Sequence, residues 1–127
     1  MNHKMPLLVL TLIALAGCAT STRLVNYTVE RFPPKDVSYT EDVYSQAQPL
    51  KTDKSYYVIG SVSIEGFASN GVSPTTLTRQ AQDQARRKGA DAIINAATQV
   101  IRYWGGDALL RFKGDLIVYA PSAASAV

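Results

Sequence analysis

The chain is poor in the two side chains that most often carry chemistry, since it holds one cysteine and one histidine in 127 residues. Both lie near the N-terminus, as Cys18 and His3. No second cysteine is present to form a disulfide within the chain, so a hydrophobic core must hold the fold unaided. After Cys18 the chain has no histidine, which excludes histidine-based catalytic triads and Cys/His zinc sites from that part.

Long apolar runs are also scarce, and the one that stands out covers residues 7–16. It carries no charge and follows Lys4. A helix needs about 20 apolar residues to span a bilayer, so this run is too short to remain in the membrane as a helix. A positive charge followed by a short apolar run is typical of a cleaved export signal, and we expect residues 1–17 to be one.

The residues that end this signal match the lipobox of bacterial lipoproteins. The motif is a branched apolar residue, two small residues and a cysteine, which here are Leu15, Ala16, Gly17 and Cys18. It predicts cleavage between Gly17 and Cys18, attachment of diacylglycerol to the Cys18 thiol and N-acylation of the freed amine. Two or three acyl chains give a stable membrane anchor, whereas one chain binds only marginally.

The residue after the modified cysteine predicts which membrane holds the protein. In the bacterial lipoproteins that this motif resembles, aspartate at that position commonly retains the protein at the inner membrane, and this chain has Ala19 there. We therefore expect a periplasm-facing protein anchored to the outer membrane of a cell with two membranes, and otherwise to the cell membrane. Apart from the covalent lipid on Cys18, we expect no cofactor.

Charge gives little reason to expect a polyanionic partner. Removal of residues 1–17 leaves 110 residues, enough for one domain. It also removes Lys4, which lowers the formal net charge from +3 to +2 and predicts no nucleic-acid partner. The expected organisation is a signal peptide at 1–17, a lipidated tether at 18–23, a single α+β domain at 24–120 and a flexible tail at 121–127.

Alternating apolar residues predict the strands. The clearest strand covers residues 57–64, where alternate positions are apolar or glycine. Gly105, Gly106 and Asp107 predict a hairpin, because glycine supplies the backbone angles of a tight turn. The other expected strands are the arms of the hairpin at 92–104 and 109–119, and one or two weak ones before the clear strand, at 24–30 and 37–44.

A single helix is expected between residues 74 and 88. Ser73 and Pro74 are the residues preferred at the N-cap and the first helical position, and Gly89 is typical of a helix end. The apolar stripe is narrow and rich in alanine, which predicts close packing on a sheet with Gly60 making room for it. The stripe consists of Leu77, Ala81 and Ala85. The expected fold is α+β, a small, largely antiparallel sheet with one helix on a face, in the order β-β-α-β-β.

Two segments beside the expected helix resemble a group of small bacterial lipoproteins and their cytosolic relatives. They are Ile-Gly-Ser-Val at 59–62 and Gly-Ala-Asp-Ala-Ile-Ile-Asn at 89–95, within a resemblance that covers residues 33–119. The group includes the outer-membrane sensor lipoprotein of the Rcs envelope-stress system and ring-forming proteins to which heavy-metal binding is ascribed. The resemblance implies a shared small fold. Unlike the stress sensor, this chain lacks cysteines for disulfides, and it lacks the His or Cys that a heavy-metal site favours.

Two groups of side chains are candidates for a binding surface. Tyr103 and Trp104 precede the hairpin turn, where they form a binding tip or fold back over the sheet. A basic surface for lipid phosphates is the second candidate, and its alternative is ordinary helix-end charge in which Asp83 pairs with Arg87. The basic residues are Arg79, Arg86, Arg87 and Lys88.

The sequence predicts no catalytic residue and no metal ligand, because its carboxylates have no paired spacing and its serines no nucleophile motif. We therefore expect a non-enzymatic, membrane-anchored binding or envelope-sensing module with an envelope protein as partner. One alternative is a structural lipoprotein whose copies join into a ring through strand edges near 37–44 or 109–119. Another is a binder of a small ligand or metal.

Overall fold

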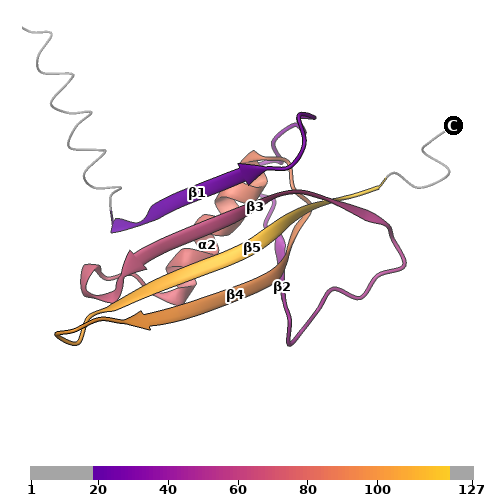
Figure 1. Ribbon diagram of the computed structural model, residues 1–127. Helices are drawn as coiled ribbons and strands as arrows, with labels where there is room; N and C mark the ends of the chain where they lie inside the picture. The colour runs from indigo at the N-terminus through magenta and orange to yellow at the C-terminus, as the bar shows by residue number, and fades with distance from the viewer. Residues whose placement is uncertain (1–18, 121–127) are drawn as a thin grey trace, which may run out of the picture.

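The computed structural model describes residues 19–120, which form a five-stranded sheet covered on one face by a helix (Figure 1). The expected signal peptide, the cleavage and lipidation sites at Gly17 and Cys18, and the expected tail at 121–127 lie outside the described residues. The elements are β1 (Ser21–Asn26), β2 (Asp42–Ser45), β3 (Tyr56–Phe67), the 3₁₀ helix η2 (Ala68–Asn70), α2 (Pro74–Arg87), β4 (Ala92–Arg102) and β5 (Ala108–Tyr119).

The strands lie side by side in the order β1-β3-β5-β4-β2. Neighbours are antiparallel except at one edge, where β2 runs parallel to β4. The sheet is therefore mixed, which corrects the expectation of a largely antiparallel one. A parallel pair needs a long connection, here through β3 and α2, so its direction is not visible in the residues of the strand itself.

The expected order β-β-α-β-β is also wrong, because three strands precede the helix. Both weak segments overlap a strand, because β1 includes residues 24–26 of the first and β2 includes residues 42–44 of the second. β1 gains its stability from a six-residue ladder with β3 rather than from its own pattern. It begins at Ser21, inside the segment that we expected to be a tether.

The helix begins and ends as predicted. The Ser73 hydroxyl accepts a hydrogen bond from the Thr76 amide, and Pro74 occupies the first turn. Gly89 follows the helix with a φ of 75°, in the left-handed region. The stripe of one leucine and two alanines is fully buried against the sheet, as expected. Its residues are Leu77, Ala81 and Ala85.

Gly60 makes room for a strand and not for the helix, which corrects the expectation. A Cβ atom at Gly60 would lie 2.4 Å from the Val25 carbonyl oxygen of β1. The close approach is therefore that of the first strand to β3. The backbone of β1 would have to shift if this glycine were replaced by any larger residue.

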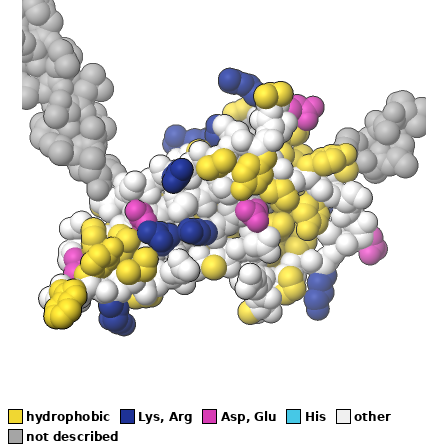
Figure 2. All heavy atoms as spheres, in the orientation of Figure 1, with side chains coloured by type: hydrophobic (Ala, Val, Ile, Leu, Met, Phe, Trp, Pro, Cys, Tyr) yellow, Lys and Arg dark blue, Asp and Glu magenta, His cyan; other side chains and the backbone are white. Residues whose placement is uncertain are grey.

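The main core lies between α2 and the sheet, where Ile64, Leu77 and Ile93 are completely buried. A smaller apolar cluster covers one end of the opposite face, around Ala92, Ile94 and Ile117. The middle of that opposite face is polar, and charged side chains cross it in Figure 2. The partly buried side chains that cover the smaller cluster are Tyr44, Leu50 and Tyr119.

The strand edges differ from those expected for a self-assembling protein. β5 lies between β3 and β4, so residues 109–119 offer no edge for another copy. β2 does lie at an edge, within the expected segment 37–44, but it has only four residues. The opposite edge is β1, with six residues.

Candidate functional site

The turn between β4 and β5 projects from one end of the sheet, at the left in Figure 1. Gly105 and Gly106 have φ values of 89° and 87°, and the Tyr103 amide donates to the Asp107 carbonyl oxygen at 2.9 Å. Trp104 stands at the turn with an exposed fraction of 102%. Of the two alternatives for this side chain, the tip describes its position, since it covers none of the sheet.

Contacts with the neighbouring loop brace this turn. The Ser69 hydroxyl of η2 donates to an Asp107 carboxylate oxygen at 2.7 Å, and the Ala108 amide donates to the other oxygen at 2.8 Å. The hydrogen bond from Ser69 holds the pKa of Asp107 below its usual range. The ring centroids of Phe67 and Tyr103 lie 5.7 Å apart. The hairpin is thus fixed to the end of β3.

Phe67, Tyr103 and Trp104 together form what we call the aromatic tip. Phe67 and Tyr103 remain 37% and 48% exposed although their rings are in contact. Hydrophobic side chains gather at this end of the molecule in Figure 2. Large aromatic side chains held in water by a rigid turn are typical of binding surfaces. The binding tip predicted from the sequence did not include Phe67, because only the fold brings this residue beside the hairpin.

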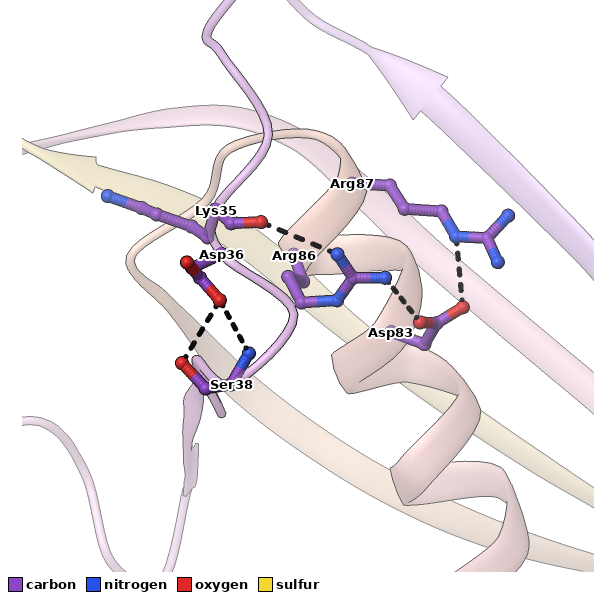
Figure 3. A network of polar contacts seen from close by, with 6 residues as sticks. All are labelled: Lys35, Asp36, Ser38, Asp83, Arg86 and Arg87. Atoms are coloured by element: carbon purple, nitrogen blue, oxygen red, sulfur yellow. Dashed lines mark hydrogen bonds and ion pairs between the residues drawn. The ribbon is translucent and has the colours of Figure 1, made fainter.

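Two of the four candidate basic residues share one acidic partner. Asp83 lies between Arg86 and Arg87, at 2.9 Å from an Nη atom of the first and 3.1 Å from Nε of the second (Figure 3). Arg86 also donates to the Lys35 carbonyl oxygen at 3.4 Å. Arg79 is exposed about two turns earlier in the helix. These pairs match the helix-end alternative, in which Asp83 balances the charge.

The fourth basic residue, Lys88, lines a cleft with Arg87 at the end of α2. The cleft has a volume of about 860 Å³ and lies between the helix end and residues 26–34. Its remaining wall is contributed by Ile59 and Leu116 of the sheet. The cleft lies at the end of the sheet away from the aromatic tip.

Asp91, in the second segment that carries the family resemblance, ties several elements together. One carboxylate oxygen lies 2.6 Å from the Lys35 ammonium, and the other accepts the Tyr119 amide at 2.8 Å. Its carbonyl oxygen accepts from the Tyr39 hydroxyl at 2.7 Å. The hydrogen bond to Asp91 raises the pKa of Lys35. Asp91 therefore binds groups that are distant in the sequence, which gives this part of the motif a structural role.

Glu41 is a buried acid that sequence reasoning missed. Its side chain is 1% exposed, and neither carboxylate oxygen has a hydrogen-bond partner among the described residues. Burial raises the pKa of this carboxyl to about 7, against the opposing influence of Arg86 and Lys35. The Gln82 side chain binds only the Glu41 backbone oxygen, at 2.9 Å. Within residues 19–120, no cluster of three or more His, Cys, Asp or Glu side chains is arranged to hold a metal ion.

The polar middle of the open sheet face forms a shallow groove of about 680 Å³. One ion pair and one hydrogen bond to a carboxylate lie within this face. Arg111 donates to Glu65 at 2.7 Å, and Asn95 donates to Asp115 at 3.0 Å. In the described part of the chain, no helix is long and apolar enough to cross a membrane.

Comparison with known proteins places this chain in no family. No protein-family model matches it, and no curated protein matches it. Among solved structures it is similar to a Francisella virulence factor, FvfA, with 19% sequence identity and a TM-score of 0.49. The similarity covers 75% of this chain and 96% of that one. A likeness of this size carries no argument about function.

Proposed function

We propose that the chain is a lipid-anchored, non-enzymatic binding module of the cell envelope, held at the outer membrane where the cell has one. The module contacts an envelope component through the aromatic tip. The observation that carries this proposal is the complete exposure of Trp104 on a braced hairpin. An exposed indole gains free energy when a partner covers it, because its apolar surface leaves water.

The start of the folded domain supports an anchor held close to the body of the protein. The Thr20 hydroxyl donates to the Gln80 side chain of α2 at 2.8 Å, and β1 begins at the next residue. The predicted lipidation site, Cys18, precedes this attachment by two residues. A lipid on that cysteine therefore brings the domain to the membrane surface without a long linker.

Photo-crosslinking in cells tests the binding tip. A photoreactive residue at position 103 or 104 of the full chain should capture one reproducible envelope component, identified by mass spectrometry. The matched control is the same residue at Tyr57, which is also exposed but lies at the far end of β3. Capture from 57 as strong as from 104 contradicts the tip as the contact surface.

The anchor is tested separately with Cys18→Ser. The mature wild-type protein should carry the mass of diacylglycerol and an N-acyl chain on Cys18 and remain with the membrane fraction. The serine variant should keep residues 1–17 and carry no lipid mass. A mature wild-type protein that begins elsewhere, or lacks lipid, would overturn the proposed anchoring.

A second candidate function, self-assembly, is favoured by one observation. β1 lies at an edge of the sheet, with six residues available to pair with a second copy. Analytical ultracentrifugation of the full lipidated chain in detergent should then give a defined oligomer. A monomer at the highest attainable concentration removes this candidate.

A further inference from the structure

The aromatic tip and the start of β1 lie at the same end of the sheet (Figure 1). Ser21 pairs with Glu65, and Glu65 pairs with Arg111. The contact with β3 extends to the residue before Thr20, because a Cβ atom at Gly66 would lie 2.6 Å from the Ala19 carbonyl oxygen. Ala19 is therefore close to the level of Phe67, the first residue of the tip.

Only a short segment joins this end of the domain to the proposed anchor. Ala19 directly follows Cys18, and Thr20 is fixed to Gln80 of the helix. Two extended residues span about 7 Å, so a lipid on Cys18 keeps the Phe67 end of the sheet near the bilayer. The opposite end cannot reach the membrane surface unless the domain lies flat on it.

The hairpin projects further in the same direction. Three residue pairs separate the level of Arg111 from Arg102 and Ala108, which is about 10 Å along the strands, and Trp104 lies beyond them. Sideways, β1 and β5 are two strand spacings apart, about 10 Å. A membrane that holds the acyl chains of Cys18 is therefore within reach of Trp104.

The chemistry of this end matches the interfacial region of a bilayer. Tryptophan and tyrosine prefer that region because their rings are apolar while the indole N–H and phenol O–H keep polar partners. Arg102 is exposed at the base of the hairpin, where a cation meets lipid phosphates. The one acid of the turn, Asp107, is engaged by Ser69, and the first turn of α2 has no acidic residue.

From this geometry we infer that the component bound by the aromatic tip is the bilayer itself. The tip inserts into the interface of the membrane that carries the anchor and fixes the orientation of the domain. This inference rests on the proposed lipid anchor and deepens it, since it names the ligand of the same site. Interfacial segments insert about 5–10 Å, a depth within the reach of the hairpin.

Fluorescence tests this inference directly, because Trp104 is the only tryptophan of the chain. Full-length lipidated protein is reconstituted into phosphatidylethanolamine and phosphatidylglycerol vesicles, with and without lipids brominated near the top of the acyl chain. In both kinds of vesicle, Trp104 emission should shift to the blue relative to an indole in water. In the brominated vesicles it should also lose intensity. A variant with Trp104→Phe and Tyr57→Trp moves the indole to the far end of the sheet, and its emission should stay unquenched.

Failure of this inference can be distinguished from failure of the proposed lipid anchor. If Cys18 carries lipid mass and the protein floats with the vesicles, but Trp104 emission is that of an indole in water, the inference is overturned while the anchor stands. If Cys18 carries no lipid, the proposed anchoring itself fails. Capture of a single protein rather than lipid by photo-crosslinking from position 104 also overturns the bilayer as the ligand.

Discussion

At the scale of single residues, the burial of Glu41 makes the stability of the fold depend on pH. An isolated buried carboxylate costs far more than a buried neutral acid, and no donor in the described residues compensates for it. Its pKa rises from 4.5 to about 7 in the folded state. Both states are protonated below about pH 4.5, and the unfolded chain loses its proton first as the pH rises. Stability therefore falls between these two pKa values and is lowest above pH 7.

Glu41→Gln should remove this dependence. The shift corresponds to a loss on the order of 3 kcal/mol above pH 7, so the variant should be more stable than wild type at pH 8 and similar to it at pH 4.5. Urea denaturation at the two pH values measures the difference. Asp42→Asn is the matched control, because it makes the same charge change at an exposed neighbour. Equal losses between pH 4.5 and 8 in wild type and variant would contradict burial as the cause.

Gly89→Ala tests two destabilising effects that glycine avoids, namely backbone strain at positive φ and a steric clash of the Cβ atom. Gly89 and Gly71 both have positive φ, at 75° and 80°, so alanine at either is strained by about 1 kcal/mol or more. Only at Gly89 would the new Cβ atom also meet other groups, with the Pro33 carbonyl oxygen 2.5 Å away. Gly89→Ala should therefore lower the free energy of unfolding more than Gly71→Ala does. Equal losses in urea denaturation would show that segment 32–34 moves aside freely.

At the scale of elements, α2 depends on one large side chain. Leu77 is completely buried, while the other buried residues of the helix are alanines. Leu77→Ala should lower the free energy of unfolding by about 2–5 kcal/mol, because the small neighbouring side chains cannot fill the cavity. Arg79→Ala, on the exposed side of the same helix, should change stability by less than about 0.5 kcal/mol. Thermal and urea denaturation of the full chain compare the two, and similar losses would contradict this packing.

The hairpin depends on its brace to the η2 loop. Ser69→Ala removes the hydroxyl that donates to Asp107 and should let the turn move more freely. Time-resolved anisotropy of Trp104 measures this, with a larger amplitude of fast motion expected in the variant. Ser38→Ala removes a similar hydroxyl, bound to Asp36 in another loop, and should leave the anisotropy unchanged. No difference between the two variants would mean that the brace does not hold the tip.

The elements with local signals were the ones predictable from sequence. Ser73, Pro74 and Gly89 fixed the helix ends, and paired glycines fixed the hairpin, because these residues act on their own backbone. The pairing of β1, the parallel direction of β2 and the burial of Glu41 depend on partners far along the chain. The contact of Phe67 with the hairpin had no local signal for the same reason, so the sequence left the position of Trp104 open.

At the scale of the whole molecule, the two ends of the sheet differ in character. One end carries the aromatic tip and the start of the folded chain. The other end carries Asp91 with its partners, the buried Glu41 and the cleft beside the end of α2. With the tip in the membrane, that second end faces away from the bilayer. That end is then free to contact another envelope component.

The measurement that tests this account most directly is the depth of both ends in a membrane. Lipid occupies Cys18 in the account, so Arg102→Cys or Tyr57→Cys supplies the one free thiol for a spin label on the full lipidated chain. The twelve residues of β3 separate the two ends by about 40 Å. In vesicles, the label at 102 should be shielded from an aqueous nickel reagent and accessible to oxygen, and the label at 57 should behave in the opposite way. Equal access of the nickel reagent to both labels would contradict the account.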